Sequence, residues 1–426
     1  MRRSGVRRGS RLVLGMATLV GVGLVAAPAG AAGHGDPGMF GRHRFVHGGP
    51  APVPGTIQVV ATGLDQPKKL TLDPAGDVIV ALSGDGAAPA SCTDGAEPSC
   101  LDESGAIDRV TPQGRVTPLL GGLPSVSSGG PGPEATGPVE AREVAGTLQV
   151  LFQDTDVDPT TGAETYGPAG SDLGELRSFG WHDSGGVEAN FGLFEGVANP
   201  DHGAGTAVTL GAEAAIDSDP YSFVPYRGGY AVADAAANDL LFVSPSGHIS
   251  VLAVFPTISE VAPPGTLGPT QTTPVPVEAQ PVPDAVAVGP DGALYVGELG
   301  GEPFDPGTSS VYRVVPGQSP TVVATGFTAI GDLAFDPSGH LYVLEIDTAG
   351  IADPALSGGG LPTHGALIQV GPHGTQSIVA STGLEFPTGL VIASEGTAYV
   401  SNYGVLSATG GPGGLSGELV RVGLPR

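Results

Sequence analysis

The sequence has 426 residues, of which 43 are acidic and 17 basic, and its formal net charge is −26 at pH 7. A negative field of this size repels phosphate backbones and anionic lipid, which argues against nucleic acid and membrane surfaces as partners and favours cations or basic partners. Glycine accounts for 71 residues and proline for 41, yet 40% of the chain is hydrophobic. This combination indicates a turn-rich folded chain rather than a disordered one.

The N-terminal end has the pattern of a signal peptide. Five arginines lie within the first eleven residues, and residues 12–27 are almost wholly apolar. Residues 29–31, Ala-Gly-Ala, then fit a cleavage site after Ala31. A membrane anchor is the alternative, but the apolar run contains glycines and is shorter than the roughly 20 residues that a span needs. We expect residues 1–31 to be a signal peptide, residues 32–55 a flexible linker, and the mature protein to be secreted without membrane insertion.

Two cysteines, Cys92 and Cys100, are the only ones in the chain. In an exported protein the oxidising compartment favours a disulfide between them. Such a bridge would stiffen one loop and not hold the fold, because a short closed loop removes little chain entropy. A metal site would need further ligands nearby.

One hairpin pattern recurs along the chain. Residues 283–298 and 330–345 align without a gap, and each has an alternating strand, a glycine-containing turn and a second strand that ends in an acid. Further copies span residues 67–82, 138–152, 220–234 and 387–402. A third strand follows each hairpin and a fourth usually follows that. Four antiparallel strands in each of six repeats predict an all-β fold, a six-bladed β-propeller over residues 56–426.

The two ends of the chain predict how the ring closes. The last repeat stops after its third strand, residues 419–422. Residues 59–63 repeat the fourth-strand sequence of residues 322–326 letter for letter, but they precede the first hairpin. We expect this N-terminal strand to complete the sixth blade, which removes the free strand edges of an open array.

Four long segments interrupt the repeats and are rich in Gly, Pro, Ser and Asp, so we expect them to be loops. They are residues 83–104, 154–171, 256–280 and 351–363. The second repeat, roughly residues 138–212, is the least regular of the six.

Polar residues recur where the first strand of a hairpin starts and where the second ends, and both positions lie near the central channel on one face of a propeller. The candidate ligand-binding residues are Asp234, Asp284, Glu298, Asp332, Glu345 and Asn402. Converging oxygens suit a hard cation such as calcium, with Glu298, Glu345 and Asp332 as ligands. The alternative is that acids at strand ends cap backbone amides or face water. No catalytic residue is assigned, because no Ser-His-Asp, H-E-x-x-H or phosphate-loop pattern occurs.

The chain resembles the ScyD/ScyE-type exported propellers. The matching stretches include residues 288–299, 311–317, 342–346 and 399–402, and together the matches cover most of residues 56–423. The resemblance implies a propeller and export, and it implies no particular reaction. More distantly, the hairpins are similar to NHL repeats and to SMP-30/gluconolactonase propellers, whose divalent-metal site uses residues at first-strand starts, where this chain has Asp284 and Asp332. We therefore expect a secreted binding or scaffold propeller for a small-molecule or extracytoplasmic ligand, with a divalent-metal-dependent lactonase or lyase as the alternative.

Overall fold

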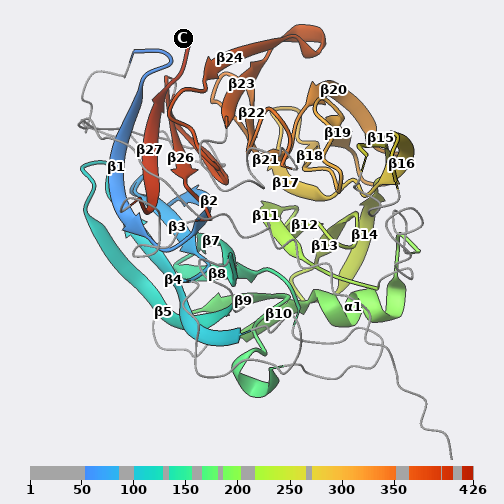
Figure 1. Ribbon diagram of the computed structural model, residues 1–426. Coiled ribbons are helices and arrows are strands. Elements are labelled where there is room, and N and C mark those ends of the chain that lie inside the picture. The colour runs from blue at the N-terminus through green and yellow to red at the C-terminus, as the bar shows by residue number, and fades with distance from the viewer. Residues whose placement is uncertain are drawn as a thin grey trace, which may run out of the picture.

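A computed structural model describes residues 53–85, 100–127, 134–155, 166–180, 186–202, 216–264, 271–351, 364–394, 396–405 and 415–425. Within these residues, six antiparallel sheets of four or five strands stand around a common centre, and one two-stranded sheet is added at the rim (Figure 1). The predicted all-β, six-bladed β-propeller is therefore confirmed.

The blades follow one another in chain order. Blade 1 contains β2 (Pro67–Leu72), β3 (Val78–Leu82), β4 (Cys100–Val110), β5 (Val116–Ser127) and β6 (Ala135–Thr136). Blade 2 contains β7 (Pro138–Val144), β8 (Thr147–Phe152), β9 (Glu175–Phe179) and β10 (Gly186–Asn190). Blade 3 contains β11 (Pro220–Tyr226), β12 (Gly229–Asp234), β13 (Asp239–Val243) and β14 (Ile249–Val254).

Blade 4 contains β17 (Pro283–Val288), β18 (Leu294–Glu298), β19 (Ser309–Val314) and β20 (Thr321–Phe327). Blade 5 contains β21 (Ile330–Phe335), β22 (Leu341–Glu345), β23 (Ala366–Val370) and β24 (Gln376–Ala380). Blade 6 contains β25 (Gly389–Ser394), β26 (Thr397–Asn402), β27 (Gly417–Gly423) and β1 (Ile57–Leu64).

The strand from the N-terminal side lies along the strand that ends the chain, as the blue and red ribbons of Figure 1 show. β1 pairs with β27 in antiparallel register, with Ile57 opposite Val422 and Val59 opposite Val420. Ile57 and Val59 also pack against the apolar core of blades 5 and 6. Residues 57–64 thus supply the fourth strand of the sheet that residues 389–423 begin.

The innermost strands form a closed ring, since each of β2, β7, β11, β17, β21 and β25 contacts the next around the centre. Five of the six inner hairpins have a register shift within the first residues of the inner strand, for example between Pro283 and Ala285. A shift of this kind leaves an extra residue that is unpaired within its own sheet. It turns consecutive side chains toward the channel and frees backbone N–H groups for other partners.

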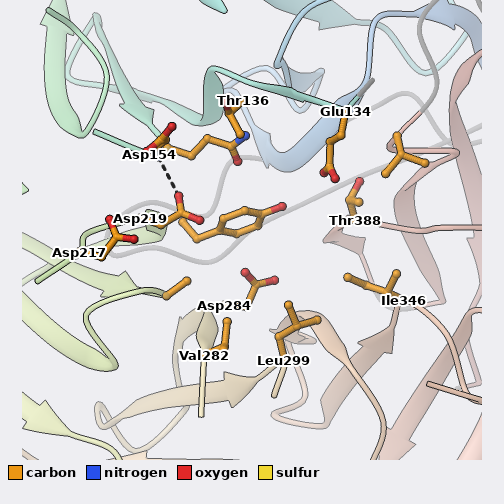
Figure 2. A pocket seen from close by; sticks show the side chains of 14 residues that line it. Glu134, Thr136, Asp154, Asp217, Asp219, Val282, Asp284, Leu299, Ile346 and Thr388 are labelled. Carbon is orange, nitrogen blue, oxygen red and sulfur yellow. Dashed lines mark hydrogen bonds between the residues drawn. The ribbon is translucent and has the colours of Figure 1, made fainter. Parts of the chain in front are cut away.

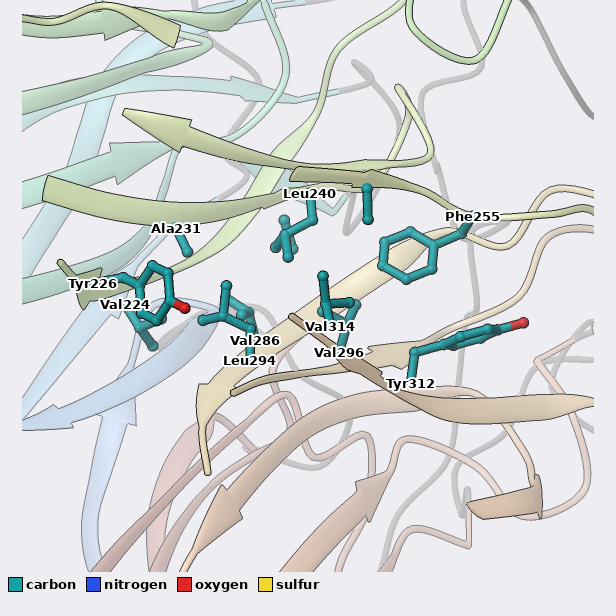
Figure 3. Packing of buried hydrophobic residues seen from close by; sticks show 12 residues of the cluster. Val224, Tyr226, Ala231, Leu240, Phe255, Val286, Leu294, Val296, Tyr312 and Val314 are labelled. Atoms are coloured by element: carbon teal, nitrogen blue, oxygen red, sulfur yellow. The ribbon is translucent and has the colours of Figure 1, made fainter. Parts of the chain in front are cut away.

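Apolar side chains fill the spaces between neighbouring blades. Figure 3 shows the space between blades 3 and 4, where Leu240 and Phe255 face Val296, Tyr312 and Val314. The rings of Phe255 and Tyr312 meet edge to face, with centroids 5.2 Å apart. Alternate residues of each strand point into such a space, which explains the alternating pattern of the repeats.

Two elements differ from the predicted loops. Residues 256–280, expected to be a loop, contain the hairpin of β15 (Ile258–Ala262) and β16 (Val275–Ala279), which their high proline content concealed. β4 begins at Cys100, so the end of the predicted loop 83–104 is part of a strand.

The structure also contains one α-helix, α1 (Phe191–Ala198), and two short 3-10 helices, η1 (Gly167–Ala169) and η2 (Pro372–Gly374), among the described residues. α1 lies in the irregular second repeat. It begins where the Asn190 side chain accepts a hydrogen bond from the Leu193 N–H, and it ends at left-handed Asn199.

The predicted signal peptide, most of the predicted linker and Cys92 lie outside the described residues. These assignments, and the Cys92–Cys100 disulfide, therefore stay predictions, although Cys100 itself is buried. No helix in the described part of the chain is long and apolar enough to cross a membrane.

Candidate functional site

The polar residues that end the second strands are buried and bind backbone amides of the loops beside them. Glu345 Oε1 accepts a hydrogen bond of 2.7 Å from the Thr328 N–H, 17 residues earlier. Asn402 Oδ1 accepts the equivalent bond, also 2.7 Å and 17 residues apart, from the Glu385 N–H. Both side chains thus hold the segment that leads into their own blade.

Two further strand-end acids follow the same principle with different partners. The residue 17 positions before Glu298 is Pro281, which has no N–H to donate, and Glu298 Oε2 accepts instead from the Ser310 N–H at 3.2 Å. Asp234 accepts from the Ser218 hydroxyl at 2.6 Å and from the Asp219 N–H at 2.7 Å. Among the described residues, the polar side chains at the strand ends therefore cap backbone amides, which is the alternative to a ligand site.

Asp284 and Asp332 occupy two successive positions of the repeat. Asp284 is the second residue of its inner strand, where the equivalent residue of blade 5 is Gly331. Asp332 is the third, equivalent to Ala285. Since consecutive residues differ in depth along the channel, these two carboxylates belong to different levels.

The deeper level joins neighbouring blades. Asp332 Oδ2 accepts a hydrogen bond of 2.7 Å from the Leu390 N–H of blade 6. At the same position of blade 2, Glu140 Oε2 accepts from the Phe223 N–H of blade 3 at 2.8 Å. Phe223 and Leu390 are themselves equivalent, since each is the fourth residue of its repeat. A side chain that takes up the freed N–H of the next blade is a structural link.

The outer level opens into a pocket at the mouth of the channel (Figure 2). The cavity has a volume of about 50 Å³, which holds a few water-sized groups. The lining residues are Glu134, Thr136, Gln153, Asp154, Asp217, Asp219, Tyr221, Ala235, Val282, Asp284, Leu299, Ile346, Thr388 and Val405. Of the six residues predicted for a ligand site, only Asp284 lines this pocket.

The pocket has an acidic side and an apolar side. In Figure 2, Asp154, Asp217 and Asp219 lie together on one side, whereas Leu299 and Ile346 lie on another. Asp154, Asp217 and Asp219 belong to blades 2 and 3 and their connecting segments, whereas Leu299 and Ile346 belong to blades 4 and 5. Two further acids lie elsewhere around the pocket: Asp284 of blade 4 stands beside Leu299, and Glu134 directly precedes β6 of blade 1 (Figure 2). A ligand that fits both sides combines a positive group with an apolar body.

Two buried lysines stand on consecutive positions of β2 beside the pocket. Lys68 Nζ pairs with Glu134 Oε1 at 2.9 Å. Lys69 Nζ lies 3.8 Å from both Asp284 Oδ2 and Asp332 Oδ1, donates to the Gly331 carbonyl, and stands 5.1 Å from the centre of the Tyr221 ring. Lys69 therefore connects the two levels of the channel.

Burial is the main influence on the carboxyl groups of the channel. It raises the pKa of Asp284 to about 7, against the opposing effect of Lys69, and that of Asp332 to about 6. The pKa of Asp219 is raised well above its ordinary value, again mainly by burial. At neutral pH, Asp284 is thus close to the midpoint of its titration.

Sequence reasoning missed most of the pocket. Two adjacent lysines inside an otherwise apolar inner strand were an available signal, because fully buried lysines are rare unless they are paired. Tyr221 both packs against the apolar core and lines the pocket. Glu134, Asp154 and Asp217 lie in connecting segments outside the repeat, where no periodic pattern points to them.

The three acids predicted as calcium ligands do not form one site. In the described parts of the chain, no group of three or more His, Cys, Asp or Glu side chains is arranged to hold a metal ion. Glu298, Glu345 and Asp332 each bind a backbone amide in a different part of the ring. The donor set expected at this face therefore does not fit a calcium ion.

No family model and no curated protein sequence matches this chain. Solved structures do match in their arrangement. A PQQ-bound aldose sugar dehydrogenase from Streptomyces coelicolor is 12% identical, with 87% of this chain and 99% of that one covered and a TM-score of 0.46. A calcium-binding protein, regucalcin, from Agrobacterium tumefaciens is 12% identical, covering 85% and 93% with a TM-score of 0.45. A virginiamycin B lyase from Staphylococcus aureus is 9% identical, covering 86% and 99% with a TM-score of 0.41. At such identities the likeness concerns chain arrangement and not activity.

Proposed function

We propose that this chain is an exported binding protein of the ScyD/ScyE type that takes a small cationic ligand with an apolar body at the channel mouth. The observation that carries the proposal is the division of the pocket into an acidic and an apolar side. The overall negative charge supports it, because it draws cations toward the protein over a longer range.

Asp284 is the central residue of this proposal. It is buried, it lines the pocket, and the ammonium group of its partner Lys69 lies 3.8 Å from its Oδ2, beyond hydrogen-bonding distance. A ligand ammonium group within hydrogen-bonding distance would favour the charged form of Asp284, whose pKa of about 7 leaves it only partly ionised beforehand. Ligand affinity should therefore rise between pH 6 and pH 8.

A matched set of four-carbon probes tests the proposal: n-butylammonium, butanol and butyrate, titrated into the protein and followed by NMR. We expect saturable binding of n-butylammonium only, and at least a tenfold loss of affinity in Asp284→Asn. Glu278→Gln, an exposed acid on β16, is the control and should bind as the wild type does. Equal affinity for butyrate and n-butylammonium, or unchanged binding in Asp284→Asn, would contradict the proposal.

A hydrolase or lyase reaction in the same pocket is the second candidate. The observation in its favour is the pKa of Asp284 near 7, which suits a general acid or base at neutral pH. A lactone panel assayed with calcium, zinc or manganese distinguishes the two functions. Turnover that Asp284→Asn abolishes favours the enzyme, and its absence with every lactone and metal favours the binding protein.

A further inference from the structure

A second group of carboxyl groups lies beneath helix α1 and does not line the channel pocket. Asp239, the first residue of β13, is completely buried, and neither of its carboxylate oxygens has a hydrogen-bond partner among the described residues. Glu195 of α1 is also buried, and its Oε2 has no partner either.

The strand register aims these groups at one another. Asp234 and Asp239 are directly opposite on β12 and β13, so their side chains project from the same face with Cβ atoms about 5 Å apart. The end of α1 lies close to Asp239, because the neighbouring Asn238 donates a hydrogen bond of 2.8 Å to Asp201 and Phe191 of α1 packs in one cluster with Leu241 of β13. Burial raises the pKa of Asp239, and the charges of Asp234, Glu195 and Asp201 raise it further. Burial raises the pKa of Glu195 to about 8, and the charges of Asp234, Asp201 and Asp217 contribute to this rise.

Within the described ranges, no ion pair balances the charge of this group. None of the ion pairs in the described part of the chain includes Glu195, Asp234 or Asp239. Asp234 differs from the other two because hydroxyl and backbone groups already occupy both its oxygens. A buried carboxylate without a hydrogen bond or a counter-charge is strongly unfavourable, so Asp239 and Glu195 either hold protons or bind a cation that the described residues do not supply.

We propose that Asp239 and Glu195 bind a calcium ion beneath helix α1. Calcium takes six to eight oxygen ligands and accepts carbonyl groups and water beside carboxylates, so the unpaired oxygens of Asp239 and Glu195, with further acids nearby, suit it. The carboxylates are not gathered around one point beforehand. Without a cation, like charges repel one another, and we expect the ion to draw in the long side chain of Glu195.

The test uses the full-length protein, first treated with a chelator and then dialysed against calcium. We expect one calcium ion per chain. We also expect a rise in unfolding temperature of about 5 °C at a hundredfold excess over Kd. Asp239→Asn should abolish the rise, and Glu195→Gln should weaken calcium affinity at least tenfold.

The matched control is Glu298→Gln, since Glu298 is also a buried carboxyl whose pKa burial raises, but no acid contributes to its shift. This variant should keep the full calcium response. The proposal is overturned if the wild type binds no calcium or shows no rise, as expected for carboxyls that only hold protons. It is equally overturned if Asp239→Asn and Glu195→Gln respond to calcium as the wild type does. Having both variants covers the case in which Asp239→Asn does not fold.

Discussion

Asp332 of blade 5 accepts a hydrogen bond of 2.7 Å from the backbone N–H of Leu390 in blade 6. Glu140 of blade 2 likewise accepts from the Phe223 N–H of blade 3, so at this position of the repeat a polar side chain takes up a backbone N–H of the next blade. Asp332, which the repeat pattern predicts as part of a ligand site, thus links two blades in the structure.

Replacing Asp332 should therefore weaken the ring. In Asp332→Ala the buried Leu390 N–H loses its acceptor, and we expect the free energy of unfolding to fall by about 1–3 kcal/mol. Asp332→Asn keeps a side-chain oxygen and should lose less. Denaturant unfolding followed by fluorescence measures both, and an Asp332→Asn as costly as Asp332→Ala would argue against the hydrogen bond as the cause.

Lys69→Met should be most damaging at high pH. It leaves Asp284 and Asp332 buried without their shared cation, and breaking a buried ion pair from one side costs about 3–5 kcal/mol. Because the pKa values are about 7 for Asp284 and about 6 for Asp332, both carboxyls are largely protonated at pH 5 and the loss should be smaller there. Unfolding free energies at pH 5 and pH 8 check this.

The double variant Lys69→Met with Asp284→Asn provides the control, since it removes one of the two carboxylates that Lys69→Met leaves without a counter-charge. It should be more stable at pH 8 than Lys69→Met alone. A loss that is the same at both pH values would show that the lysine acts through packing and not through its charge.

Glu298 should make the protein less stable as pH rises. Burial raises its pKa from 4.5 to about 8, so between these values the folded state binds more protons than the unfolded state. Stability then falls with increasing pH over this range. In Glu298→Gln this contribution is absent, and the variant should gain stability relative to the wild type between pH 5 and pH 8, on the order of a few kcal/mol. If the free energy of unfolding changed with pH in the same way in both proteins, the raised pKa of Glu298 would be refuted.

Removal of β1 should destabilise the whole ring. Without residues 57–64, the edge of β27 and the apolar residues beneath it are exposed, and we expect the unfolding temperature to fall by at least 10 °C. Adding a peptide of residues 53–66 should restore part of the loss, whereas the same peptide with Val59→Pro, which breaks the pairing, should not. A truncated protein as stable as the full chain would contradict the expectation.

Much of the fold was predictable because the hairpin repeats are local. The strands of residues 283–298 and 330–345 carry their own alternation and turns, so a comparison within the sequence placed them. The hairpin of residues 258–279 was not found, since it belongs to no repeat and its prolines are typical of loops. Helix α1 was also not predicted, because it belongs to no repeat either.

The candidate site divides in the same way. Sequence alone determined which blade each acid belongs to and that Asp284 stands at the start of an inner strand. Only the tertiary structure decided that Glu345 binds the Thr328 amide, and that Lys69 from blade 1 meets Asp284 from blade 4. The physical reason is that a repeat records strand geometry, which is local, whereas a side chain's partner depends on how six blades close around one axis.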